Sequence, residues 1–167
     1  MTKGIVSGVV SNMVTLRVDG PVLQGEICYI TTGGDRLMAE VIKVVGSDVY
    51  VQVFESTRGL KVGSEAEFTG HQLEIQLGPG MLSKNYDGLQ NDLDKMDGVF
   101  LRRGQYTAPL DEDRLWDFEP IVKAGDKVEG SAWLGKVEEN HQPLKIMAPF
   151  QMEGIAVVKS IVPAGQY

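Results

Sequence analysis

Short runs of alternating apolar and polar residues fill the first 76 residues of the chain, and tight turns rich in Gly, Asp, Ser and Pro separate them. Alternation with a period of two is typical of strands that bury one face. The runs predict strands over residues 5–10, 13–18, 26–31, 37–45, 49–54, 66–68 and 73–77, with turns at 19–21, 33–35, 46–48 and 61–63. Because an open sheet of this kind would leave aggregation-prone edges, the pattern favours a small closed β-barrel.

The segment 53–90 adds an unusual number of residues that shape the backbone. Its glycines are Gly59, Gly63, Gly70, Gly78, Gly80 and Gly88. The sequence Gly78-Pro79-Gly80 predicts a sharp exit from a strand, because glycine accepts positive φ and proline fixes φ. After this turn, apolar side chains recur with helical spacing at Leu82, Tyr86, Leu89, Leu93 and Met96. This stripe predicts a helix of about 16 residues.

An irregular segment is predicted over residues 99–118, and it carries more large apolar side chains than a surface loop usually does. They are Phe100, Tyr106, Leu110, Leu115, Trp116 and Phe118. Side chains of this size favour burial. We therefore expect an exposed apolar surface here that a neighbouring domain or chain covers.

The last part of the chain, residues 119–167, returns to a β pattern. Strands are predicted over 120–122, 127–130, 132–137, 144–147 and 155–162. The Gly-Asp-x-Val turn at 125–128, followed by an apolar hairpin, resembles biotinyl and lipoyl carrier domains, which are β-sandwiches with a modified lysine at a hairpin tip. Here the tip at 138–143 has no lysine, and Lys145 lies inside the next strand. This argues against an attached cofactor.

The charge of the chain excludes one broad class of function. Net charge is −7 and the pI is about 4.8, whereas a nucleic-acid-binding protein needs a clustered basic surface. No apolar run approaches the roughly 20 residues of a membrane helix, and the N-terminus lacks a signal-peptide core. The sequence therefore predicts a soluble, globular protein without direct membrane insertion.

The chemically reactive side chains do not form a recognisable site. Cys28 is the single cysteine and is expected in the core of a strand. His71 and His141 lie far from it and from each other, so no pair has metal-ligand spacing. The carboxylates at 111–113 beside Trp116 could act as an acid–base pair, but the polar run favours a solvated turn. No catalytic, cofactor-binding or metal-binding residue is assigned.

Several short motifs follow one another in an order typical of a single family. They are Phe54-Glu55-x-Thr57-x-Gly59-Leu60-x-x-Gly63, Thr69-Gly70, Leu77-Gly78-Pro79-Gly80, Asp87-Gly88-x-Gln90, Phe100-Leu101-Arg102-Arg103-Gly104, Leu110-Asp111, Trp116-Asp117-Phe118-Glu119-Pro120, Gly125-Asp126-Lys127-Val128 and Lys145-Ile146-Met147-Ala148-Pro149. In this order they resemble the catalytic A (alpha) subunit of the V-type and A-type rotary ATPases, from Gly4 to Gly165. The chain departs from the family at Asn91-Asp92-Leu93, where a basic residue, a proline and a leucine are usual.

The resemblance implies a mainly β fold in three parts. Residues 1–77 would form the N-terminal β-barrel, 78–118 a helix and linker that pack on an absent nucleotide-binding domain, and 119–167 a bulge-type, biotinyl-like β sandwich-barrel that is truncated. Arg102 and Arg103 would form an inter-domain salt bridge. The candidates for inter-domain packing are Leu82, Tyr86, Leu89, Leu93, Phe100, Arg102, Arg103, Trp116 and Phe118.

The resemblance also implies a function for the parent protein. The parent would couple ATP hydrolysis or synthesis to proton or sodium transport by rotary catalysis, with ATP and Mg bound there. This chain is expected to be a non-catalytic N-terminal piece, since in its Lys159-Ser160 pair Val158 stands where a phosphate loop needs glycine.

The implied partners are B subunits in an alternating hexamer, and peripheral stalk subunits, in a complex on the cytoplasmic face of a membrane. One alternative is a free-standing biotinyl- or lipoyl-like carrier or adaptor module. Another is a small-ligand-binding β-barrel, which would have no need of the linker and its aromatic residues.

Overall fold

The computed structural model describes residues 2–96 and 103–167, and the chain divides into two compact units. The barrel unit comprises Met1–Ile75 and Met96–Tyr106, and the C-terminal unit comprises Gln76–Lys95 and Thr107–Tyr167. Among the described residues, no helix is long and apolar enough to cross a membrane.

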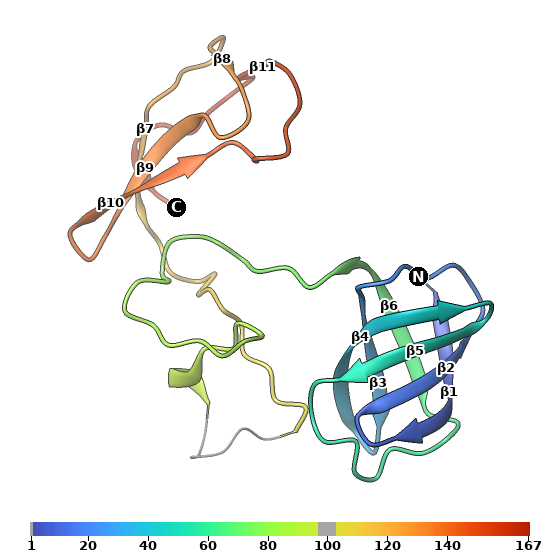
Figure 1. Ribbon diagram of the computed structural model, residues 1–167. Coiled ribbons are helices and arrows are strands. Elements are labelled where there is room, and N and C mark those ends of the chain that lie inside the picture. The colour runs from blue at the N-terminus through green and yellow to red at the C-terminus, as the bar shows by residue number, and fades with distance from the viewer. Residues whose placement is uncertain (1, 97–102) are drawn as a thin grey trace. The chain divides into compact units, whose positions relative to one another are not determined.

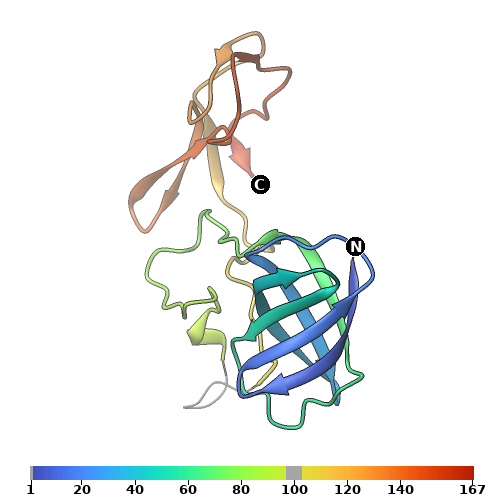
Figure 2. The same cartoon turned by 45° about the vertical axis from the view of Figure 1, so that its right-hand side comes forward.

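The barrel unit is a closed six-stranded antiparallel barrel with the strand order β1-β2-β5-β4-β3-β6 (Figures 1 and 2). Its strands are β1 (Lys3–Val10), β2 (Met13–Val18), β3 (Glu26–Thr32), β4 (Asp35–Val45), β5 (Asp48–Val53) and β6 (Glu65–Gln72). Closure is completed where Lys3, Gly4 and Ile5 of β1 pair with β6. The predicted mainly β fold with a closed N-terminal barrel is confirmed.

The barrel core follows from the alternation of side chains along the strands, because every second residue points inward. The buried cluster is Val6, Val14, Leu16, Cys28, Ile30, Leu37, Ala39, Val41, Val49, Val51, Val53, Ala66 and Phe68. Cys28 is fully buried, as predicted. Burial, and secondarily the negative charge of Glu26, raises the pKa of Cys28 to about 12, so its thiol stays protonated and unreactive at neutral pH.

The predicted seventh strand at 73–77 is absent. Strand β6 ends at Gln72, which pairs with Glu26 at the start of β3, so the barrel offers no strand opposite the next residues. Leu73, Ile75 and Leu77 are 43%, 62% and 69% exposed. Alternation predicted a strand here, but a strand also needs a partner edge for its backbone hydrogen bonds.

The predicted helix over residues 82–96 is wrong, and only a 3₁₀ turn, η1 (Leu93–Lys95), forms there. Ser83 and Gln90 have φ of 63° and 61°, which a right-handed helix cannot contain. The Asp87 carboxylate accepts hydrogen bonds from the backbone N–H groups of Leu89 and Asn91. Short polar side chains that bond to nearby backbone compete with helix formation in this way, and the apolar stripe did not reveal them.

The C-terminal unit contains two small sheets. One has the order β10-β9-β7-β12 and the other pairs β11 with β8. The strands are β7 (Asp117–Pro120), β8 (Lys127–Val128), β9 (Trp133–Glu139), β10 (Gln142–Met147), β11 (Ala156–Val157) and β12 (Gly165–Gln166). Several are shorter than predicted; the strand expected over 155–162 is reduced to β11. The β9–β10 hairpin turns at Asn140 and His141, both in the left-handed region, as a two-residue hairpin turn requires.

Candidate functional site

The C-terminal unit has an open apolar hollow of about 260 Å³. Its walls are Pro79, Trp116, Phe118, Val137, Ile146, Val162 and Tyr167. Trp116 and Phe118 were predicted packing residues, and the structure brings them together here. The other five were not, because the sequence gives no signal that Pro79 and the C-terminal residues Val162 and Tyr167 converge on one sheet.

Backbone pairing and ring packing hold the hollow in shape. The amides and carbonyls of Trp116 and Tyr167 bond to each other in both directions, at 2.8 and 3.1 Å. Phe118 and Tyr167 make an edge-to-face pair with ring centroids 6.5 Å apart, a preferred aromatic geometry. The Arg114 guanidinium lies 4.0 Å from the centre of the Trp116 ring. Trp116 and Phe118 are half-buried within this unit.

The Gly78-Pro79-Gly80 turn lies against the same aromatic cluster. A Cβ at Gly78 would come within 3.0 Å of Leu110, and one at Gly80 within 3.4 Å of Trp116. Gly80 also has φ of 101°. The turn was predicted as the exit from a strand; in the structure it instead follows irregular chain and lets the backbone approach the linker side chains closely.

A cluster of hydrogen-bonded polar side chains stands next to this turn, in place of the predicted helix. This cluster, called the polar knot below, is formed by Lys84, Asp87, Gln90, Asn91, Asp92 and Thr107. Gln90 mimics a strand partner, because its side-chain oxygen accepts from Gln76 N at 2.7 Å and its side-chain nitrogen donates to Gln76 O at 2.6 Å. The buried Asp92 pairs with Lys84 at 3.2 Å, and this hydrogen bond raises the pKa of Lys84. Thr107 donates its backbone N–H to Asn91 Oδ1 at 2.9 Å. These bonds join residues 76, 84 and 90–92 to one another and to Thr107.

The ionisation of Asp87 makes the stability of the polar knot depend on pH. Burial acts to raise the pKa of Asp87, but its hydrogen bonds from Asn91 and Leu89 outweigh burial and hold the pKa below the ordinary value. A carboxyl with a depressed folded pKa stabilises the fold above its unfolded pKa, about 3.9, and this contribution is lost as pH falls through the folded value.

Replacing Asp87 by Asn is therefore expected to cost the C-terminal unit about 1 kcal/mol at pH 7. The Asn amide nitrogen would face the Asn91 amide nitrogen in place of the carboxylate oxygen 2.8 Å from it. Thermal unfolding measured from pH 7 to pH 2 should show a smaller acid loss in Asp87→Asn than in the original chain below about pH 4. Parallel acid profiles for the two proteins would contradict this account.

The remaining packing candidates are distributed over both units. Leu82 is 46% exposed and Leu93 38% exposed, while Tyr86 and Leu89 are half-buried. Tyr86 donates its hydroxyl to Pro109 O at 2.9 Å. Arg103 belongs to the barrel unit, where its Nε lies 3.5 Å from Asp35. Phe100 and Arg102 lie outside the described residues.

The hairpin tip lacks the chemistry of a carrier domain. Asn140 and His141 occupy the turn, and Lys145 lies in β10 with its Nζ 3.1 Å from the centre of the Trp133 ring. The tip instead contacts the linker, because buried Glu139 accepts a hydrogen bond from Leu82 N at 2.8 Å. The carboxylates at 111–113 are exposed, in the solvated turn that was predicted.

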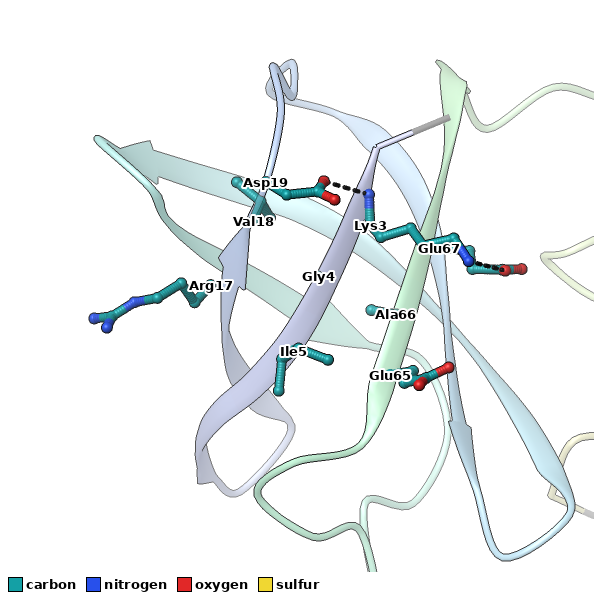
Figure 3. A pocket seen from close by; sticks show the side chains of 9 residues that line it. All are labelled: Lys3, Gly4, Ile5, Arg17, Val18, Asp19, Glu65, Ala66 and Glu67. Atoms are coloured by element: carbon teal, nitrogen blue, oxygen red, sulfur yellow. Dashed lines mark hydrogen bonds and ion pairs between the residues drawn. The ribbon is translucent and has the colours of Figure 1, made fainter.

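A groove of about 370 Å³ lies on the barrel between β1, β2 and β6 (Figure 3). Its lining residues are Lys3, Gly4, Ile5, Arg17, Val18, Asp19, Glu65, Ala66 and Glu67. Lys3 makes two polar contacts: its backbone N–H donates a hydrogen bond to the Asp19 carboxylate at 2.9 Å, and its Nζ forms an ion pair with Glu67 at 3.8 Å. The charged residues of this lining are three carboxylates and two cations, so the groove disfavours a nucleotide phosphate.

The candidate metal ligands and the Lys159-Ser160 pair can each be compared with the geometry that their chemistry would need. Within 2–96 and 103–167, no three His, Cys, Asp or Glu side chains cluster as metal ligands. Before the Lys159-Ser160 pair, Val158 donates its N–H to Asp126 O at 2.9 Å and accepts from Gly125 N at 2.9 Å. This backbone is committed to strand-like pairing, whereas a phosphate loop needs N–H groups directed at the anion.

Two family models match the chain. The beta-barrel domain of the ATP synthase alpha/beta family matches residues 6–70, and the ATP synthase alpha/beta subunit barrel-sandwich domain matches residues 107–167. The two matches fall on the two sets of strands described above.

Curated relatives are similar along almost the whole chain. The V-type ATP synthase alpha chain of Borreliella afzelii (strain PKo) is 44% identical over 169 residues, and that of Treponema denticola is 43% identical over 169 residues. Each alignment covers 99% of this chain but 29% of the relative. The chain thus spans less than a third of the length of these relatives.

Proposed function

Because the chain belongs to the ATP synthase alpha/beta family, we propose that it is the N-terminal part of the catalytic alpha (A) subunit of a V-type ATP synthase. The observation that carries this proposal is the 43–44% identity to V-type ATP synthase alpha chains over 99% of the chain. The parent subunit would hydrolyse or make ATP with Mg and so drive proton or sodium transport. The complex would lie on the cytoplasmic face of the membrane.

The role of this part would be assembly. The closed barrel would join barrels of neighbouring B subunits in an alternating hexamer, and the C-terminal unit would offer a surface to peripheral stalk subunits. The hollow around Trp116 and Phe118 would be covered by the nucleotide-binding domain of the parent. Support comes from the exposure of its rim, where Val162 and Tyr167 are 46% and 49% exposed, and from the general preference of large rings for burial.

Nucleotide chemistry would belong to the rest of the parent. Two observations support the proposal that this chain alone does not bind ATP: the backbone at Val158 is paired, and the lining of the barrel groove is net negative. Isothermal titration calorimetry of the 167-residue chain with MgATP is expected to give no heat of binding at micromolar to millimolar nucleotide. Saturable micromolar binding would contradict the assignment of nucleotide chemistry to other parts of the parent.

Assembly can be tested with a chimaera. This chain would replace the aligned N-terminal 29% of the Treponema denticola V-type ATP synthase alpha chain, which would then be expressed with the remaining subunits of that complex. We expect the chimaera to co-purify with them and to hydrolyse ATP, whereas an alpha chain lacking the region should not assemble. A chimaera that folds but remains alone would contradict the assembly role.

A further inference from the structure

The groove on the barrel has a floor and two walls, which follow from the register of its three strands (Figure 3). Gly4 of β1 lies opposite Val18 of β2 and Ala66 of β6. Gly4 and Ala66 are buried and Val18 packs against the core, because alternate residues of a strand point to opposite faces. The backbone of these three residues therefore forms the floor, and the outward-pointing rows before and after them form the walls.

An apolar side chain stands in the middle of one wall. This wall is the row Arg17, Ile5 and Glu65, and the other is the row Asp19, Lys3 and Glu67. Ile5 is 46% exposed. The groove thus offers an apolar contact along its length, with charged groups at its two ends.

Both cations of the walls are already paired with carboxylates. Arg17 Nη2 lies 3.3 Å from Asp48, which does not line the groove, and Figure 3 shows the Arg17 side chain extending away from Ile5. Lys3 Nζ lies 3.8 Å from Glu67. The Glu65 carboxylate has neither a hydrogen bond nor an ion pair among the described residues. The β6 end of the groove therefore carries an excess of negative charge.

Two carboxylates flank this β6 end. Glu65 and Glu67 occupy alternate positions of β6, so their side chains stand on the same face, about 7 Å apart along the strand. A cationic group between them would interact with both. Lysine and arginine side chains place their aliphatic stems along apolar surface and keep their charged heads in water. Such a side chain matches the apolar floor, Ile5 and the acidic end together.

We propose that the groove binds a basic side chain of a partner protein, with the stem over the floor and against Ile5 and the cationic head between Glu65 and Glu67. Arginine suits this site best, because its planar fork can bond to two carboxylates. A volume of about 370 Å³ lies near the lower end of the roughly 300–1,000 Å³ typical of ligand pockets, which suits a single side chain. Under the assembly role proposed above, on which this choice of partner rests, the barrel of a neighbouring subunit would supply the side chain.

A capped tripeptide with arginine between two valines probes the groove in the 167-residue chain. Nuclear magnetic resonance titration should show saturable shifts of the Ile5, Glu65 and Ala66 amides with a millimolar Kd, weakening as salt is raised. The same tripeptide with glutamate in place of arginine should give no saturable shift.

Matched variants of the chain locate the bound peptide. Glu65→Gln should weaken binding of the arginine peptide about three- to fivefold. Glu112→Gln, at an exposed carboxylate of the C-terminal unit, should leave the affinity unchanged. Absence of saturable shifts in the original chain, or equal affinities of the two variants, would overturn the groove as a site for a basic side chain.

Assembly then tests the source of the side chain. The Treponema denticola chimaera would carry Glu65→Lys, with Glu112→Lys as its control and circular dichroism of the 167-residue variants as the check on folding. Glu65→Lys should lower the yield of assembled complex about tenfold, because it places like charges together in the contact. Equal assembly of the two chimaeras would overturn the neighbouring barrel as the source. A peptide that binds to a chain whose unmodified chimaera stays alone would support the groove and contradict only the assembly role.

Discussion

Replacing Phe68 by Ala is expected to lower the free energy of unfolding of the barrel by about 3–5 kcal/mol. Phe68 is 1% exposed and is the largest of the fully buried side chains. It lies on β6 opposite Cys28 of β3. The hydrogen-bonded ladders on both sides of β6 prevent the barrel from collapsing into the space that the ring leaves, so the cost includes a cavity as well as the lost burial.

The measurement is calorimetric unfolding of Phe68→Ala beside Phe150→Ala. Phe150 is 69% exposed in the C-terminal unit, and its truncation should change stability by no more than about 0.5 kcal/mol. Because a chain of two compact units need not unfold in a single transition, the transition of the barrel is followed through hydrogen exchange of the β2 and β5 amides. Similar losses in the two variants would mean that the barrel core is not packed as described.

Replacing Gly135 by Ala is expected to destabilise the C-terminal unit by about 3 kcal/mol, because the added methyl group would overpack its site, whereas Phe68→Ala leaves a cavity in the barrel. A Cβ at Gly135 would lie 2.1 and 2.3 Å from two ring carbons of Phe118 and 2.9 Å from Glu119 O. The ring must move, and the carbonyl belongs to β7, which pairs with β9 at this point. Phe118 would then leave its place against Tyr167 and the apolar hollow would lose its shape.

Gly88→Ala is the matched control, because among the described residues no atom beyond its chain neighbours lies within 4 Å of the position where its Cβ would stand, and its φ is not in the left-handed region. Its effect on the melting temperature should be close to zero. A second change, Phe118→Leu, should recover part of the loss in Gly135→Ala, because the two sites share one space. Equal stability of Gly135→Ala and Gly88→Ala would contradict the observed packing.

Much of the barrel could be predicted from alternation alone. The expected strands and the observed β1 to β5 agree within one or two residues at each end, and the buried residues Val14, Leu16, Val49 and Val51 lie at alternate positions within them. A buried face leaves that pattern in any strand, wherever its partner lies in the sequence. The short ordered motifs likewise sufficed to indicate the family.

The linker could not be predicted in the same way. The stripe from Leu82 to Met96 has helical spacing, yet Asp87, Gln90 and Asn91 bond to the backbone and to Thr107 and Gln76. Thr107 lies 16 residues after Asn91, so no local pattern encodes that bond. Half-exposed Leu82 and Leu93 confirm that the apolar stripe did not define a buried face within this chain.

The sequence by itself determined the first five barrel strands, the burial of Cys28 and the family to which the chain belongs, because these depend on local periodicity and on residue identity. Only the tertiary structure decided the path of residues 82–96 and 103–106, the convergence of Trp116, Phe118 and Tyr167, and the attachment of Tyr106 to Glu55, 51 residues away. Those contacts join polar and aromatic groups from distant parts of the chain. Their geometry therefore exists only after the two β units have folded.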